Sequence, residues 1–182
     1  GSFDKEITDI MEAELRGHEG VSLNLNEAVS EFEGKDGKIS GVKTNKGSYP
    51  ADIVILATGV RPNTKFLEGT GIETLKNGAI VIDGRGRSSI KGIYAAGDCA
   101  TVYHKIKKEN VYIPLATTSN KIGRVVGENL AGKDREFKGT LGSAAIKVLN
   151  LEAGRTGISS DEAEKMGINY KSVLVEDKTK TS

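Results

Sequence analysis

The most informative stretch of this sequence is Gly92-Ile93-Tyr94-Ala95-Ala96-Gly97-Asp98. Its apolar centre predicts a short strand over residues 93–96, which ends at a glycine–aspartate pair. Ligands of parallel-sheet proteins bind outside the carboxyl ends of the strands. Gly97 has no side chain to block a close approach there, and the Asp98 carboxylate can accept hydrogen bonds from ligand hydroxyls. We therefore predict a binding site at Gly97 and Asp98, with an ordinary turn at a strand end as the alternative.

A continuous apolar run precedes this stretch, Asp52-Ile53-Val54-Ile55-Leu56-Ala57-Thr58-Gly59. A strand that is covered on both faces, as in a parallel sheet, has this composition. The run therefore predicts a buried strand whose end at Gly59 brings the backbone close to a bound dinucleotide, or else a tight crossover. Residues 79–83 predict another short strand. No Gly-x-Gly-x-x-Gly motif occurs in the sequence, so the usual glycine signature of a dinucleotide site is missing.

A helical pattern follows over residues 115–131, after Pro114 and before Gly132. Its apolar stripe consists of Ile122, Val125, Val126 and Leu130. The predicted N-terminus at Leu115-Ala116-Thr117 presents unpaired backbone N–H groups and a partial positive charge, which suit an anionic ligand such as a reduced flavin. The alternative is an ordinary helix that packs through its apolar stripe.

The remaining patterns alternate between helix and strand. Residues 3–17 predict an amphipathic helix that Ser2 can cap. Short alternating segments between residues 21 and 50, separated by turn signals, predict three or four antiparallel strands. Further on we expect a strand over 144–151, a helix over 160–166 with a capping box at Ser159 and Glu162, and a strand over 170–176. The order predicts an α/β protein.

Composition excludes several classes of protein. The chain has 182 residues and a net charge of +1, so no broad basic field attracts nucleic acid or an anionic membrane. No apolar run approaches the ~20 residues of a membrane span. The single cysteine, Cys99, excludes an internal disulfide framework and suits a reducing compartment, so we expect a cytoplasmic protein. Cys99 has no partner for thiol chemistry and is interpreted as a small packing residue, and no cluster has metal-ligand spacing.

Taken in this order and spacing, the segments resemble the pyridine nucleotide-disulfide oxidoreductase family, and within it the CoA-disulfide reductase and NADH oxidase branch. Residues 52–63 resemble the end of the family's NAD(P)H domain and the return into its FAD domain. Gly92–Asp98 resembles its second FAD motif, and Pro114–Thr117 with Asn120–Arg124 resembles the helix that faces the flavin. Ala153-Gly154-Arg155-Thr156-Gly157 resembles the start of the branch's dimer-interface domain.

The resemblance implies a fold made of partial FAD/NAD(P)-binding three-layer Rossmann-like domains plus the start of an α+β dimer-interface domain. Residues 1–60 correspond to the C-terminal half of the NAD(P)H domain. Residues 61–132 correspond to the C-terminal part of the FAD domain, and 139–182 to the N-terminal part of the dimerisation domain. The family's first FAD motif, its NAD(P)H glycine motif and its redox-active cysteine have no counterpart in this sequence.

The implied activity is that of a homodimeric, FAD-dependent NAD(P)H oxidoreductase, which passes hydride through FAD to a disulfide, a polysulfide or oxygen. Gly97 and Asp98 would hold the ribityl chain of FAD, and Leu115, Ala116 and Thr117 would face the flavin with backbone donors. Gly59 would lie on the nicotinamide side, and Asn120 would touch a CoA-type substrate or be a plain surface residue. No residue of this chain is assigned as catalytic, and none as a metal ligand. The alternatives are a flavin reductase that serves a protein carrier, and a catalytically incompetent fragment.

Overall fold

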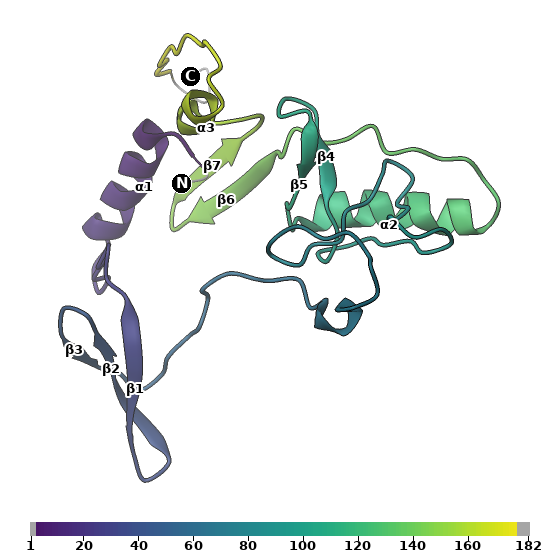
Figure 1. The fold of residues 1–182 in the computed structure, drawn as a ribbon. Helices are drawn as coiled ribbons and strands as arrows, with labels where there is room; N and C mark the ends of the chain where they lie inside the picture. Colours follow the sequence, from purple (N-terminus) through teal and green to yellow (C-terminus); the bar gives the residue numbers. More distant parts are fainter. Residues whose placement is uncertain (1–2, 178–182) are drawn as a thin grey trace. The chain divides into compact units, whose positions relative to one another are not determined.

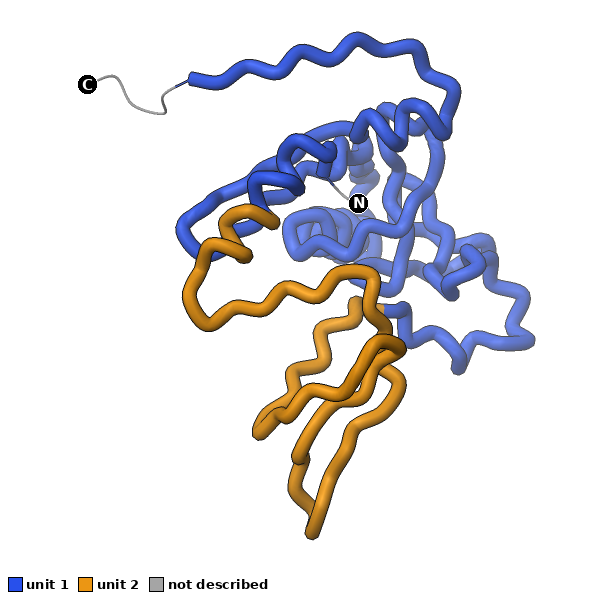
Figure 2. Tube along the Cα trace, turned by 90° about the vertical axis from the view of Figure 1, so that its left-hand side faces the viewer, with its two compact units in different colours: residues 1–11, 61–182 blue, residues 12–60 orange. Residues whose placement is uncertain are grey.

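The computed structural model describes residues 3–177, so the predicted cap at Ser2 lies outside the described residues. The chain forms two compact units (Figure 2). Unit 1 consists of residues 1–11 and 61–182, and unit 2 of residues 12–60. The helix predicted over 3–17 is confirmed as α1 (Lys5–Gly17), and its residues divide between the two units.

Unit 2 contains an antiparallel meander of β1 (Val29–Lys35), β2 (Lys38–Thr44) and β3 (Ser48–Pro50) (Figure 1). Asp36 and Gly37 form the tight turn between β1 and β2, and both have positive φ angles, 52° and 75°. Two successive positive φ angles match the right-handed twist of the strands that they join. The predicted antiparallel strands are thus confirmed.

The apolar run 52–59 is not a strand, and this prediction was wrong. It has no hydrogen-bonded neighbouring strand among residues 3–177, and most of its side chains are exposed, Ile53 by 81% and Ile55 by 85%. A strand of this composition needs a strand on each side and a covered face above and below. The described part of the chain supplies no such partner beside it, so the composition alone does not produce the strand.

Unit 1 is built around one apolar cluster, formed by Ile80, Ile82, Ala100, Val102 and Ile122. The strands predicted over 79–83 and 93–96 are wrong as continuous elements, because only isolated bridges form there. Ile80 pairs in parallel with Ala100 and antiparallel with Thr74, and Tyr94 pairs with Arg87. The parallel pairing stops at Ile82, whose N–H donates to the Thr101 hydroxyl over 3.2 Å instead of to a backbone carbonyl. Parallel pairing at the centre of the core nevertheless survives.

The rest of this core comes from a hairpin and a helix (Figure 1). β4 (Val102–His104) and β5 (Glu109–Val111) form the hairpin, and α2 (Ala116–Leu130) confirms the helix predicted over 115–131. Ile122 is buried in the core and Val126 packs against it, whereas Leu130 at the end of the stripe is exposed. A short 3-10 helix, η1 (Lys65–Leu67), precedes the core.

The C-terminal part of unit 1 differs from the prediction at two places. The strand predicted over 144–151 is instead a hairpin of β6 (Ala144–Val148) and β7 (Leu151–Arg155), because Leu149 adopts a φ of 54° and turns the chain. Residues 170–176 form no strand and are exposed, since no neighbouring strand pairs with them in the described chain. α3 (Ser160–Lys165) confirms the predicted helix and has the predicted capping box between Ser159 and Glu162.

Candidate functional site

Asp98 lies beside the first turn of α2. The Ser119 hydroxyl donates a hydrogen bond to Oδ1 of Asp98 over 2.6 Å, so the loop after the Ala95-Ala96 segment and the start of the helix meet at this point. Asp98 is exposed, while Ser119 is half-buried. The structure therefore brings together two of the segments that the sequence singled out separately.

Gly97 shapes the loop that presents Asp98. Its φ is 91°, a conformation that side chains with a Cβ rarely adopt, so glycine is required here. A Cβ built at this position would meet no atom within 4 Å. The backbone of Gly97 thus faces open space and leaves room for a ligand to approach.

The N-terminus of α2 has no side-chain cap. Leu115 occupies the cap position, where an apolar side chain cannot accept a hydrogen bond. The Leu115 carbonyl accepts from the N–H groups of Thr118 and Ser119, at 3.0 and 2.9 Å. The N–H groups of Ala116 and Thr117 precede these and have no acceptor one turn back. Both residues are exposed, so their N–H groups and the helix dipole are available to an anionic group.

Tyr112 adds a third polar group that sequence analysis missed. Its hydroxyl oxygen is buried and has no hydrogen-bond partner among residues 3–177. Burial raises the pKa of Tyr112, and the nearby negative charge of Asp98 raises it further. A buried hydroxyl without a partner is uncommon in proteins and points to a group from a ligand or a water. No motif in the sequence marks this tyrosine, because its burial depends on how the chain packs around it.

This set of groups fits the middle of an FAD molecule. A carboxylate accepts hydrogen bonds from the hydroxyls of a polyol chain, and helix N–H groups donate to a ring edge that gains negative charge. Gly97 leaves the space in which such a chain could lie against the backbone. The residues present are thus compatible with the cofactor that the sequence implied.

The other predicted site residues have different surroundings. Gly59 belongs to unit 2, has a φ of 102° and faces open space. Asn120 is exposed on α2, and its Nδ2 donates to the Ala116 carbonyl of its own helix over 3.0 Å. Cys99 packs against the core, and its Sγ contacts the Ala96 carbonyl at 3.4 Å, which suits a packing residue. Within residues 3–177 we find no group of His, Cys, Asp or Glu side chains that could hold a metal ion.

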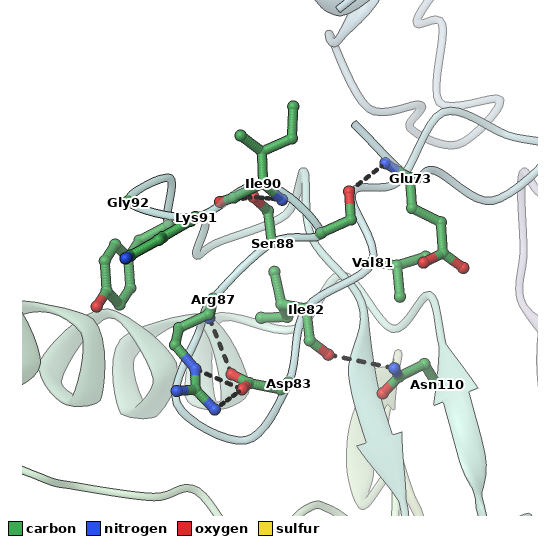
Figure 3. A pocket seen from close by; sticks show the side chains of 12 residues that line it. Glu73, Val81, Ile82, Asp83, Arg87, Ser88, Ile90, Lys91, Gly92 and Asn110 are labelled. Atoms are coloured by element: carbon green, nitrogen blue, oxygen red, sulfur yellow. Dashed lines mark hydrogen bonds and ion pairs between the residues drawn. The ribbon is translucent and has the colours of Figure 1, made fainter. Parts of the chain in front are cut away.

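A cavity of about 770 Å³ with a mixed polar and apolar lining lies on another part of unit 1, and Gly92 forms part of its wall (Figure 3). Three of its polar side chains make contacts within the protein. Arg87 forms an ion pair with Asp83 at 2.6 Å, and Nδ2 of Asn110 donates to the Ile82 carbonyl at 3.2 Å. These contacts hold the turn at residues 83–87 in place, and we assign the cavity no role in the chemistry.

An ion-pair cluster connects the β4–β5 turn to α3. Glu162 accepts from Lys107 at 2.7 Å and from Arg155 at 3.0 Å, and the backbone N–H of Ser159 donates to it at 3.0 Å. Burial alone would raise the pKa of Glu162, but these partners outweigh it and lower the pKa to about 2. The cluster borders a cavity of about 400 Å³ that also reaches Tyr112.

His104 is buried at the edge of the same cavity. Its Nδ1 accepts from the backbone N–H groups of Ile106 and Lys107, at 3.3 and 3.2 Å. Burial lowers the pKa of His104, and the positive charge of Lys107 lowers it further. The ring is therefore held neutral with its proton on Nε2, and it supports the β4–β5 turn rather than acting as an acid or base.

Comparisons with known proteins find relatives along nearly the whole chain. The sequence profile of a family described as pyridine nucleotide-disulphide oxidoreductase matches residues 1–123. The NAD(P)H sulfur oxidoreductase (CoA-dependent) of Pyrococcus furiosus is 41% identical over 179 residues, which cover 98% of this chain and 40% of the relative. An NADH oxidase of Streptococcus pneumoniae is 40% identical over 169 residues, which cover 93% of this chain and 36% of the relative. The chain thus spans about 40% of the length of the curated relatives that it matches.

Solved structures give the same result for the fold. A water-forming NADH oxidase from Lactobacillus brevis, bound to NADH, has a TM-score of 0.88 and 39% identity, and the match covers 97% of this chain and 38% of that one. An NAD-dependent persulfide reductase from A. fulgidus has a TM-score of 0.84 and 32% identity over 92% of this chain and 31% of that one. The predicted α/β, Rossmann-like fold class is thereby confirmed.

No helix in the described part of this chain has the length and apolar character needed to span a membrane.

Proposed function

This chain belongs to the pyridine nucleotide-disulphide oxidoreductase family, and on that premise we propose that it forms part of an FAD-dependent NAD(P)H oxidoreductase of the CoA-disulfide reductase and NADH oxidase type. The observation that carries the proposal is the meeting of the Asp98 carboxylate with the uncapped N-terminus of α2. Acceptor and donors of this kind suit the polyol chain and the electron-accepting ring of one cofactor. When bound, FAD supplies the ring that takes up hydride, while the protein binds and orients it.

Each predicted residue has a role in this proposal. Asp98 accepts hydrogen bonds from the ribityl hydroxyls of FAD, and Gly97 lets the chain approach the backbone. The segment Leu115–Thr117 directs its backbone N–H groups at the ring edge that becomes negative. Gly59 lies on the nicotinamide side. Asn120 contacts a CoA-type substrate through its side-chain amide, which also donates one hydrogen bond within α2.

The electron acceptor is proposed to be a disulfide, a polysulfide or oxygen. The relatives named as a CoA-dependent NAD(P)H sulfur oxidoreductase and as an NADH oxidase support these acceptors. We also propose the three-part division of the chain at 1–60, 61–132 and 139–182. The assembly of the full-length protein as a cytoplasmic homodimer belongs to the same proposal.

The test measures FAD binding by the full-length protein through flavin fluorescence, for the wild type and for D98A. We expect the wild type to bind FAD in a one-to-one ratio and D98A to bind about 10- to 100-fold more weakly, because hydrogen bonds to a charged group are lost. D161N removes an exposed carboxylate on α3 and is the matched control. NAD(P)H oxidation is then measured with CoA disulfide, polysulfide or oxygen as the single acceptor. A full-length protein that binds no FAD overturns the proposal.

A further inference from the structure

We propose that Ser119 is a positioning residue for Asp98 in cofactor binding, an inference that rests on the proposed function. The hydroxyl of Ser119 donates to Oδ1 of Asp98 over 2.6 Å, the short distance typical of a hydroxyl bound to a carboxylate. The serine itself is well placed, since its backbone N–H bonds to the Leu115 carbonyl at 2.9 Å. The donor is therefore fixed by the helix, and the acceptor is the group that it orients.

Asp98 needs such a restraint because of where it lies. It is exposed, so packing by neighbouring side chains does little to hold its carboxylate. An unrestrained carboxylate beside a helix N-terminus turns to the first N–H groups and caps the helix. That capping would block the N–H groups of Ala116 and Thr117, which are proposed to face the flavin. The structure contains no such side-chain cap on α2.

The hydrogen bond from Ser119 leaves Asp98 to bind the polyol chain and the N–H groups of α2 to bind the ring. It engages Oδ1, while Oδ2 of Asp98 has no hydrogen bond among the residues that the structure describes. One oxygen is thus held by the helix, and the other is left for a ligand hydroxyl. Ser119 thereby keeps the acceptor for the polyol chain and the donors for the ring apart. Ser119 does not itself touch the ligand in this arrangement.

A double-mutant cycle on the full-length protein tests this role. The dissociation constant of FAD is measured by flavin fluorescence for wild type, S119A, D98A and the double variant, with S119T as the conservative substitution. We expect S119A to weaken FAD binding about tenfold, and S119T, which keeps the hydroxyl, to stay within about twofold of wild type. In the D98A background, S119A should add less than about twofold, because the group that it orients is gone.

The controls distinguish the positioning role from a structural one. S30A removes an exposed serine hydroxyl that bonds to the Lys43 carbonyl in unit 2, and it should leave FAD binding unchanged. Thermal unfolding of the apoprotein should be the same for S119A and wild type, since alanine is a good helix former. An equal effect of S119A with and without Asp98, or a failure of S119T to bind like wild type, overturns the inference.

The outcome also separates this inference from the proposed function. If the wild type binds no FAD, both fail together. If the wild type binds FAD and D98A weakens it while S119A does not, the proposed function stands and the role of Ser119 is wrong.

Discussion

Glu162 shows how single residues set the pH response of unit 1. Its two cationic partners are largely buried, Lys107 with 21% and Arg155 with 18% of the side chain exposed. Because the partners hold the folded-state pKa of Glu162 at about 2, below its ordinary 4.5, the pair interactions contribute fully above pH 4.5. Their contribution is lost as the pH falls from 4.5 to about 2.

We predict that E162Q lowers the free energy of unfolding by about 1–3 kcal/mol at neutral pH, because Lys107 and Arg155 lose a charged partner. The difference from wild type should shrink as the pH falls below 4.5. Urea unfolding at a series of pH values measures both effects. E152Q, on the exposed face of β7, makes the same charge change outside the cluster and should leave stability unaltered. Equal stability of E162Q and wild type at pH 7 would contradict the prediction.

His104 is predicted to take up its second ring proton at a lower pH in the folded protein than in the unfolded chain. Its folded-state pKa is lower than the ordinary 6.5, so the unfolded chain binds the proton first. Stability therefore falls as the pH drops from 6.5 toward the folded-state value, and it recovers as the pH rises. Nitrogen-15 NMR of the imidazole should show a proton on Nε2 and none on Nδ1 at neutral pH, and the midpoint of its titration should lie below 6.5. A midpoint above 6.5 would contradict the arrangement of hydrogen bonds around Nδ1.

At the scale of elements, the helices and turns with local sequence signals were predicted correctly, whereas most strands that need a distant partner were not. The helices α2 and α3 carry their own signals, an apolar stripe with Pro114 and Gly132 at its ends, and a capping box. The β1–β2 hairpin likewise has a local turn signal, Asp36-Gly37. Most of the wrong predictions concern strands whose structure depends on a distant partner, at 52–59, 79–83, 93–96 and 170–176. The prediction for residues 144–151 was wrong for a different reason, because the positive φ of Leu149 makes this segment a hairpin instead of one strand.

The packing of the 83–87 turn against α2 leads to a test at the same scale. Gly86 has a φ of 79°, and a Cβ there would overlap Cγ2 of Val126 on α2. We predict that G86A lowers the free energy of unfolding by about 2–5 kcal/mol, from the strained backbone and the overpacking together. G69A is the matched control, because Gly69 has nearly the same φ, 80°, but open space around it. It should cost only about 1–2 kcal/mol in the same urea unfolding experiment. Equal losses for the two variants would show that the clash is absent.

At the scale of the whole molecule, the exposed apolar run 52–59 is expected to behave differently in this chain and in the full-length protein. Ile55 is 85% exposed in this chain. We predict that I55K changes the stability of the 182-residue chain by less than about 0.5 kcal/mol, as surface substitutions do. In the full-length protein we expect a loss of about 3–5 kcal/mol, because a parallel strand covered on both faces would bury the unpaired charge. Thermal unfolding of both lengths measures this difference, and equal small effects in both would mean that the run stays exposed.

The cofactor gives a second prediction at this scale. The sequence contains the proposed flavin-ribityl site but no Gly-x-Gly-x-x-Gly motif, so two of the three expected dinucleotide-contacting elements are missing from it. We expect the 182-residue chain, purified by itself, to retain little or no FAD. The absorbance of the purified chain in the flavin bands measures this directly. A stoichiometric yellow chromophore would show that residues 97–117 hold the cofactor without the rest.

The sequence by itself determined the helices, because their signals lie in residues close together in the chain. The order and spacing of its segments determined the α/β class and the family, and short motifs singled out the two segments of the candidate site. Helix stripes, caps, tight turns and the Gly97-Asp98 pair need no distant partner to be recognised. Only the tertiary structure showed that Ser119 reaches Asp98, that the Tyr112 hydroxyl is buried without a partner, and that Glu162 joins Lys107 and Arg155. These contacts join residues 7 to 55 positions apart, or depend on burial by the whole core. Neither spacing nor composition encodes such pairings, since they arise when the elements pack.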